Sequence, residues 1–444
     1  MTTTTIVAQG VIDVHSHLIT PEFVSALEGE GRVMDEGFPL PRYDAEAHLK
    51  WMDEAGVQTS VLTLAAPQPT SARVVRSTNE AAAKLKREHR GRFLFCAALP
   101  LPDVDAAISE AIYALDTLKA DGVKLATNVE GQYLGAPELD TLFSVLNERR
   151  AVVILHPHRP EPVNRRVMEQ TPLAMQEYLS ETTRAVSNMI SRDVLARYPN
   201  VKVVVPHCGA YLPLSVPRMK SLAPVMQANK MVGDIDWEAN LAALYYDLAG
   251  AHSPEVIRML LTITTPDHLL YGSDYPYVAP QVLTQSLQRM KQYLAAEPDL
   301  APFREMILHK NGEWLMGLSQ TMPAPVETYK GRMVCRLAEI EVYPEHLTEY
   351  LSYANEVDRL SVEREQGVVC LFPMQSAEDS TRIHILEIYA SEEAYQQHLK
   401  TAHFQKYKQG TLHMVKSLKL PTMQPLDPET MKLIFKKLQT RNFR

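Results

Sequence analysis

Short runs of β-branched and aliphatic residues alternate, up to about residue 275, with longer segments whose apolar positions recur at helical spacing. Several of the helical segments end at a glycine, which is a common helix stop. The alternation predicts parallel strands joined by helical crossovers. Eight apolar runs predict the strands: residues 10–15, 59–65, 92–99, 122–127, 151–156, 201–207, 243–249 and 268–274.

Eight strand–helix units in roughly 270 residues match the count and length of a closed (β/α)8 TIM barrel. The alternative is an open doubly wound sheet. The chain carries no glycine-rich phosphate loop after its first predicted strand, so the closed barrel is favoured.

The pattern changes after the barrel. Residues rich in Pro, Thr and Met predict a linker, and a β-α-β-β-α-β order then predicts an α+β domain of the ferredoxin-like kind. An aspartate cap predicts one more helix near the end of the chain. The expected organisation is a barrel over 1–320, a linker over 321–331, a ferredoxin-like domain over 332–420 and a helical tail over 421–444.

Composition narrows the class of protein. Acidic residues outnumber basic ones by 53 to 45, which gives a formal charge of −8 and argues against nucleic acid as a partner. Four scattered cysteines form neither a disulfide framework nor a zinc motif, which favours a reduced compartment. Neither a signal peptide nor a membrane-spanning run is evident. We therefore expect a cytoplasmic protein that binds no membrane.

Candidate metal ligands follow several predicted strands. In a parallel barrel the active site lies at the C-terminal ends of the strands. His15 and His17 stand two residues apart in an extended segment, so their side chains face the same side. His156, His207 and Asp274 end three other strands. Imidazole and carboxylate groups suit Zn²⁺, and three or four of them with one open position make a catalytic centre.

These segments also resemble a known group, the amidohydrolase-related decarboxylases, which includes aminocarboxymuconate semialdehyde, γ-resorcylate and 6-methylsalicylate decarboxylases; the last is the most similar. The resemblance implies a metal bound by His15, His17, His156 and Asp274, with His207 as the acid–base residue beside it. It covers roughly three quarters of the chain and is carried by VIDVHSHLITPEF, ILHPH, VVVPHCGAYLP and YGSDYP, supported by segments 91–108, 118–128, 181–190 and 244–250.

Two positions depart from the patterns of such proteins. Relatives usually have glycine at the position of Cys208, directly after His207. We expect Cys208 to be a small buried residue. A nucleophilic cysteine would need a second histidine as its partner, and none is evident. Lys124 lies in the fourth predicted strand, where some distant amidohydrolases carry a carboxylated lysine between two metals. It lies inside that strand, which favours a structural or supporting role over a two-metal site.

A substrate carboxylate needs a cationic partner, and arginine suits it best. Arg184 and Arg159 follow the fifth predicted strand, and Arg42 is a third candidate; a solvated surface role is the alternative for each. Tyr277 is a candidate for lining the substrate pocket. Tyr246, Asp247 and Tyr275, near the same strand ends, are candidates for either pocket or core.

The C-terminal segment resembles the antibiotic-biosynthesis monooxygenase-like domains, on the basis of a Glu-rich first strand, Arg364, Glu365 and Gly367 before the second strand, and His398 with His403 and Phe404. Such domains form dimers, and some oxidise phenols or quinols without a cofactor. A dimerisation or lid role is favoured over catalysis, which leaves His384, His398 and His403 as candidates only.

The leading hypothesis is therefore metal-dependent, non-oxidative decarboxylation of a small hydroxyaromatic acid of the salicylate or 6-methylsalicylate type. His207 and Asp274 would handle protons, and Arg184, Arg159 and Tyr277 would bind substrate. The expected metal is Zn²⁺, with Mn²⁺ as the alternative, and the expected assembly is a homodimer. One alternative is a metal-dependent hydrolase or hydratase acting on a lactone, an amide or an unsaturated acid. Another is a bifunctional decarboxylase–monooxygenase.

Overall fold

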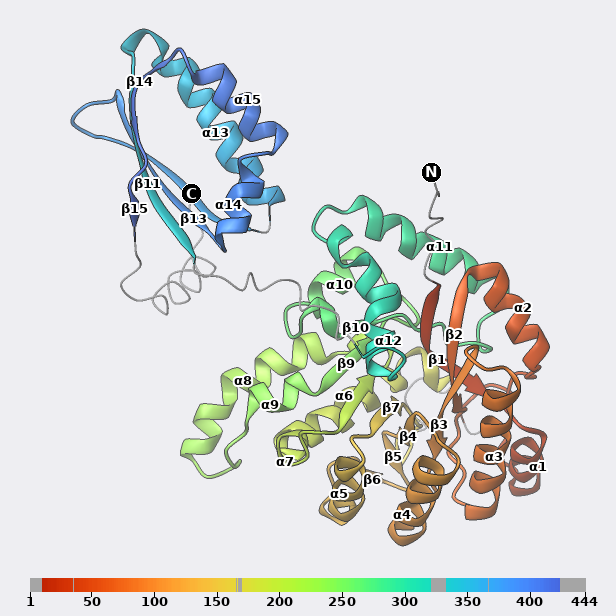
Figure 1. The fold of residues 1–444 in the computed structure, drawn as a ribbon. Coiled ribbons are helices and arrows are strands. Elements are labelled where there is room, and N and C mark those ends of the chain that lie inside the picture. The colour runs from red at the N-terminus through yellow and green to blue at the C-terminus, as the bar shows by residue number, and fades with distance from the viewer. Residues whose placement is uncertain are drawn as a thin grey trace. The chain divides into compact units, whose positions relative to one another are not determined.

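The computed structural model describes residues 10–34, 36–164, 166, 170–320, 333–365 and 367–423. The chain divides between residues 326 and 327 into two compact units, and each is described by itself (Figure 1). The predicted linker and most of the predicted C-terminal helical tail lie outside the described residues. None of the described helices combines the length and apolar character needed to span a bilayer.

The first unit is the predicted (β/α)8 barrel. Its eight strands pair in parallel in the order of the chain, so each predicted strand is confirmed. The strands are β1 (Val11–Leu18), β2 (Val57–Leu64), β3 (Phe93–Ala98), β4 (Gly122–Ala126), β7 (Val152–His156), β8 (Lys202–Val205), β9 (Leu244–Asp247) and β10 (Leu269–Leu270).

Helices surround the strands on the outside (Figure 1). A short hairpin of β5 (Asn128–Val129) and β6 (Gln132–Tyr133) follows β4. The helices are α1 (Pro21–Glu30), α2 (Ala45–Ala55), α3 (Ala72–Glu88), α4 (Val104–Ile112), α5 (Asp140–Glu148), α6 (Glu177–Ser191), α7 (Val194–Arg197), α8 (Leu212–Ala228), α9 (Trp237–Ala242), α10 (Pro254–Leu260), α11 (Pro280–Ala296) and α12 (Asn311–Leu315).

Local sequence explains where such helices begin and end, as α2 shows. The side chain of Asp44 accepts a hydrogen bond from the backbone N–H of Ala47 at 2.7 Å and so caps the N-terminus. Gly56 ends the helix in the left-handed conformation, at a φ of 74°. The helix then buries Trp51 and Met52 in the layer between the helices and the strands.

The barrel is closed by backbone hydrogen bonds between β1 and the segment after β10. Val14 N–H donates to Tyr271 O at 3.0 Å, and His17 N–H donates to Tyr275 O at 2.7 Å. The last strand is shorter than predicted, because β10 ends at Leu270 and the following residues turn toward β1. Closure thus places residue 274 beside the end of the first strand.

Apolar side chains pack on both faces of the barrel strands. Inside, Ile12, Val61, Ile154 and Val204 belong to one buried cluster, so the lower part of the barrel is packed and not open. A larger cluster packs the outer strand faces against the helices.

The second unit has the predicted ferredoxin-like α+β fold. Its antiparallel sheet has the order β12-β13-β11-β14, with β15 also paired to β11, and its helices cover one face of the sheet (Figure 1). The elements are β11 (Val334–Val342), α13 (Leu347–Arg364), β12 (Val368–Gln375), β13 (Arg382–Tyr389), α14 (Glu392–His398), α15 (Ala402–Thr411), β14 (Val415–Lys419) and β15 (Thr422–Met423).

Gly122 marks a close approach of β4 to β7. A Cβ at this position would lie 2.4 Å from the Val152 carbonyl oxygen, and a backbone atom cannot move aside as a flexible side chain can. We expect Gly122→Ala to lower the free energy of unfolding of the barrel by about 1–3 kcal/mol. All three tryptophans of the chain lie in the barrel, so tryptophan fluorescence during urea unfolding measures this change.

Gly29→Ala is the matched control. This glycine lies in α1, and nothing lies within 4 Å of the Cβ that it would gain. Alanine should here raise the free energy of unfolding by about 0.5–1 kcal/mol, because it reduces the freedom of the unfolded chain. Equal effects of the two substitutions would contradict the steric argument.

Candidate metal centre and its surroundings

Four of the predicted residues converge at the C-terminal mouth of the barrel. His15, His17, His156 and Asp274 each offer one ligand atom, and these four atoms lie within 4.8 Å of one another. The Nε2 atoms of His15 and His17 are 3.2 Å apart, and Oδ1 of Asp274 lies 3.1 Å from His17 Nε2 and 3.5 Å from His15 Nε2. The arrangement is that of a site able to hold one metal ion.

The backbone that presents the two histidines of β1 is less regular than simple alternation assumes. Asp13 pairs with Ser60 of β2, whereas Ser16 pairs with Leu62, so β1 carries one extra residue at a β-bulge. Bulges commonly redirect a side chain next to an active site. The spacing therefore predicted two residues whose side chains converge, although the geometry that brings them together is a bulge.

Hydrogen bonds on the outer side of the rings determine which nitrogens face the centre. Nδ1 of His15 lies 2.8 Å from Oδ2 of Asp247, and Nδ1 of His156 lies 2.8 Å from the carbonyl oxygen of Pro157. Carboxylate and carbonyl oxygens only accept, so both Nδ1 atoms carry the proton. In their neutral forms these two histidines consequently present the lone pairs of Nε2 to the centre.

In His17, too, a hydrogen bond on the outer side of the ring places the proton on Nδ1. Its Nδ1 lies 3.2 Å from Oγ1 of Thr63, and that hydroxyl donates its own proton to the Ser16 carbonyl at 3.0 Å. Oγ1 therefore accepts from Nδ1–H, and His17 also directs a lone pair inward. When the imidazoles are neutral, three nitrogen lone pairs and a carboxylate meet at the centre, which is an arrangement that a cation stabilises. Burial opposes a charge on His15, but Asp247 and Asp274 raise its pKa to about 9 overall, so a bound cation would take the place of a proton on Nε2.

Asp247 is the residue that sequence reasoning underestimated. Besides fixing His15, its carboxylate accepts from the backbone N–H of His207 at 3.1 Å and of Ala249 at 3.0 Å. Burial opposes ionisation, but the charge and hydrogen bond of His15 lower the pKa of Asp247 overall. Its position at the end of β9 was the available signal. What the sequence did not reveal was its partner, 232 positions away.

Asp13 is a second buried carboxylate at the mouth. It accepts from the Ser60 hydroxyl at 2.9 Å, from the Ser273 hydroxyl at 2.7 Å and from the His15 N–H at 3.1 Å. Burial outweighs these bonds and raises the pKa of Asp13 to about 6. Asp13 thereby ties β2 and the segment before Asp274 to the bulge of β1.

His207 follows β8 in a left-handed turn. His207, Cys208 and Gly209 have φ values of 54°, 56° and 73°, a conformation that non-glycine residues adopt at some cost. The turn places the His207 ring 5.2 Å from that of His15 and its Nε2 3.8 Å from Oδ2 of Asp274. His207 thus lies beside the four converging ligand atoms and contacts the carboxylate from its other side.

Cys208 is buried, as expected from the sequence. Its Sγ lies 3.7 Å from the carbonyl oxygen of Ala249, and burial strongly raises the pKa of the thiol. An un-ionised buried thiol is a poor nucleophile. The positive φ of Cys208 is a conformation that glycine would adopt without strain.

The predicted substrate-binding arginines both contact carboxylates of the chain itself. Arg184, on α6, pairs with the buried Glu181 and donates to the hydroxyl of Tyr133 at 3.1 Å. Nη2 of Arg159 lies 3.3 Å from a carboxylate oxygen of Glu161. Contact of either arginine with a substrate stays a prediction.

Tyr277 lies next to the four ligands. Its ring meets that of His17 edge-on at a centroid distance of 5.2 Å. Its hydroxyl donates to the carbonyl oxygen of Ala66 at 3.3 Å, which fixes the ring after β10. The position is suitable for a side chain that flanks an aromatic substrate.

In the second unit, two of the three candidate histidines converge. Nδ1 of His398 lies 3.0 Å and Nε2 of His403 lies 2.5 Å from Oε1 of Glu365. Both histidines can donate to this carboxylate, so hydrogen bonding accounts for the cluster. His384 lies in β13, where it pairs with Glu339 and Met374.

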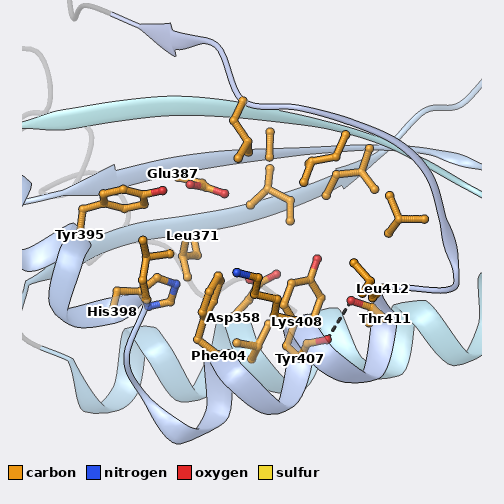
Figure 2. Close-up of a pocket in the computed structure, with 18 of the residues that line it drawn as sticks. Asp358, Leu371, Glu387, Tyr395, His398, Phe404, Tyr407, Lys408, Thr411 and Leu412 are labelled. Atoms are coloured by element: carbon orange, nitrogen blue, oxygen red, sulfur yellow. Dashed lines mark hydrogen bonds between the residues drawn. The ribbon is translucent and has the colours of Figure 1, made fainter.

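A cavity of about 540 Å³ lies between the sheet and the helices of this unit (Figure 2). Its lining is mainly apolar, with His398 on one wall and the carboxyl groups of Asp358 and Glu387 inside. Oδ2 of Asp358 is buried and has no hydrogen-bond partner among the described residues. Burial and the charge of Glu387 raise the pKa of Asp358 to about 7.

Both units match known families. The family model described as Amidohydrolase matches residues 12–318, and the model described as Antibiotic biosynthesis monooxygenase matches residues 333–410. A decarboxylase of Aspergillus niger, yanB, is 34% identical over 301 residues, which are 64% of this chain and 81% of that protein. A 6-methylsalicylic acid decarboxylase of Penicillium expansum is 30% identical over 276 residues, which are 60% of this chain and 84% of that protein.

A solved structure agrees with the fold of the barrel. The crystal structure of a dihydroxybenzoic acid decarboxylase from Polaromonas sp. JS666, with bound manganese and the inhibitor 2-nitroresorcinol, superposes with a TM-score of 0.59. It is 18% identical, and the match covers 70% of this chain and 98% of that one. At this identity the likeness shows the fold.

Asp358 generates a prediction for the stability of the second unit. Its pKa in the folded state, about 7, lies above the value of 3.8 for a free aspartate, so ionisation opposes folding. The resulting loss of stability begins above pH 4 and is complete above pH 7. We expect Asp358→Asn to raise the free energy of unfolding at pH 8 by at least about 1 kcal/mol, with little effect at pH 4.

Thermal denaturation at the two pH values measures this difference. The exposed Glu378→Gln, in the same unit, removes a negative charge without altering a buried group and is the control. If both substitutions gave the same pH dependence, burial of the Asp358 carboxyl could not be its cause.

Proposed function

The chain belongs to the amidohydrolase family, and we propose that it catalyses metal-dependent, non-oxidative decarboxylation. The substrate would be a small hydroxyaromatic acid of the salicylate or 6-methylsalicylate type. The single observation that carries the proposal is the convergence of three imidazole lone pairs and one carboxylate at the barrel mouth. Similarity to decarboxylases over most of their length selects this reaction over hydrolysis and hydration.

His15, His17, His156 and Asp274 would hold the metal. Three neutral imidazoles and one carboxylate suit Zn²⁺, which we propose as the resident ion, with Mn²⁺ as the alternative because a protein of the same fold binds it. When bound, the ion would polarise the oxygens of the carboxylate and the ortho hydroxyl group and stabilise negative charge on them. Metal analysis of the purified protein distinguishes the two ions.

The side chains of the site must also supply a proton. As carbon dioxide leaves, the ring carbon that carried it gains one proton, so the acid ArCOO⁻ and H⁺ become ArH and CO₂. Burial opposes ionisation of Asp274, but its interactions with the imidazole groups of His17 and His207 hold its pKa well below the usual range. Asp274 is therefore suited to be a charged ligand, and His207, 3.8 Å from its second oxygen, is suited to carry the proton.

The buried network around His207 positions this proton carrier. Asp247 accepts from its backbone N–H, and the left-handed turn orients its ring toward Asp274. Tyr277 is placed to flank the substrate ring beside His17. Arg184 and Arg159 stay proposed contacts of the substrate, although each contacts a carboxylate of the chain.

The metal-loaded protein should release carbon dioxide from 6-methylsalicylate or another 2-hydroxybenzoate. We expect no release from 4-hydroxybenzoate, which lacks the ortho hydroxyl group. Mass spectrometry of the products checks the outcome, since a hydrolase or hydratase would instead add water. The proposal is wrong if the metal-loaded protein releases carbon dioxide from none of a wide panel of 2-hydroxybenzoates.

Two variants separate the roles of the site residues in this assay. His207→Gln should lower kcat by about 10²–10⁴-fold, which is typical for loss of a general acid, while the metal content stays near that of the unmodified protein. Asp274→Asn should lower both activity and metal content. Cys208→Gly, at a position with positive φ, is the control and should retain activity.

We propose that the second unit mediates a homodimer. Phe372 and Met374 are large exposed apolar residues on β12, and burying such a surface against a second copy would stabilise it. A chain that ends at residue 320 should then be monomeric and still decarboxylate its substrate. Light scattering coupled to gel filtration measures the mass of both forms; equal assembly states would contradict the dimerisation role.

A further inference from the structure

Lys124 lies inside the barrel, one layer below the metal-binding residues. Its partner in the neighbouring strand is Ile154, while Ala126 pairs with His156. Paired residues of adjacent strands point to the same face of a sheet, and Ile154 belongs to the buried cluster of the barrel interior. The lysine side chain therefore enters the interior directly beneath the ligand His156.

The ammonium group of Lys124 lacks a close anionic partner. The residue is 1% exposed, and Nζ donates to Oε1 of Gln68 at 2.7 Å. Within the described parts of the chain, no carboxylate oxygen lies within 4.0 Å of Nζ. Glu36 acts on it only from farther away, and its own oxygens lie 3.1 Å from His158 Nδ1 and from the Tyr178 hydroxyl.

The positive charge of Lys124 also acts on two histidines, His17 and His158. After burial itself, the positive charge of Lys124 is among the causes that lower the pKa of His17 to about 4 and that of His158 to about 3. Burial lowers the pKa of Lys124 itself to about 7. A buried cation with one neutral hydrogen-bond partner is costly unless an anion arrives beside it.

Gln68 fixes the amine in this position. Its amide nitrogen donates to the carbonyl oxygen of Leu99 at 3.0 Å, which leaves its oxygen facing Lys124. An ammonium group has three N–H donors, and Gln68 accepts from one. The others are available for a carboxylate, which can accept more than one hydrogen bond.

We propose that Lys124, oriented by Gln68, forms a carboxylate-binding subsite beside the metal centre and provides the cation that holds the substrate's acid group. The assignment rests on the proposed function for the identity of that acid. Arg184 and Arg159 already pair with carboxylates of the chain, whereas Lys124 does not. Loss of carbon dioxide removes the charge that Lys124 binds, so the neutral phenol product is held less tightly than the acid.

Two variants of the full-length, metal-loaded protein test this subsite. Lys124→Met removes the charge at similar volume, and Gln68→Glu places a carboxylate against Nζ that competes with the substrate. Each should raise KM for the 2-hydroxybenzoate by about 10- to 100-fold, the loss expected for a charged hydrogen bond. Inhibition by the phenol product should change less than about threefold, and the metal content should stay constant.

Lys86→Met is the matched control, because this lysine lies on α3 and pairs with Asp121; KM should not change. The proposal is overturned if Lys124→Met and Gln68→Glu leave KM unchanged, weaken the phenol equally or release the metal. It is also overturned if Arg184→Met raises KM and Lys124→Met does not.

Calorimetric binding of the acid and of the phenol to the same proteins needs no turnover. If the unmodified chain decarboxylates nothing but binds the acid through Lys124, the proposed function fails and the subsite remains. If turnover proceeds and Lys124→Met binds the acid as tightly as the unmodified chain, the subsite alone fails.

Discussion

The closure of β1 on the segment that follows β10 is the constraint on which the whole site depends. Two backbone hydrogen bonds from β1, together with the bonds that Asp13 accepts from Ser273, hold the first and last strands side by side. Only this closure brings Asp274 within 3.1 Å of His17. Without it the histidines of β1 would face an open edge, with no carboxylate beside them.

Buried polar groups lie at the mouth of the barrel, because the apolar interior below offers them few hydrogen-bond partners. Asp13 and Asp247 are both buried, and each is satisfied by three or more hydrogen bonds. They orient the histidines from outside, so the inward lone pairs are left for a cation. Lys124 is the exception among these groups, because its amine donates to the neutral side chain of Gln68 and to no carboxylate of the described residues. With a metal bound as proposed, the metal and the amine would together favour the binding of an acid.

The second unit shows a different use of buried charge. Asp358 and Glu387 lie in an apolar cavity, and burial raises the pKa of both. Glu365 in turn accepts from two histidines, which lower its pKa despite burial. The unit therefore retains polar groups where an apolar core would be more stable. The sequence placed these groups in a ferredoxin-like domain, but their grouping around one cavity follows from how α13 and α14 pack on the sheet.

The amino-acid sequence by itself determined the eight strands and the order of the second unit, because alternation and periodicity are local properties. It also placed His15, His17, His156 and Asp274 in or after the first, fifth and eighth strands of the barrel. The tertiary structure alone decided which groups meet. The Asp247–His15 contact joins residues 232 positions apart, and such pairs depend on strand register and closure. The same reason applies to Arg184 and Arg159, whose contacts with Glu181 and Glu161 the sequence did not predict: whether a cation has an anionic partner is decided by folding, not by the order of residues.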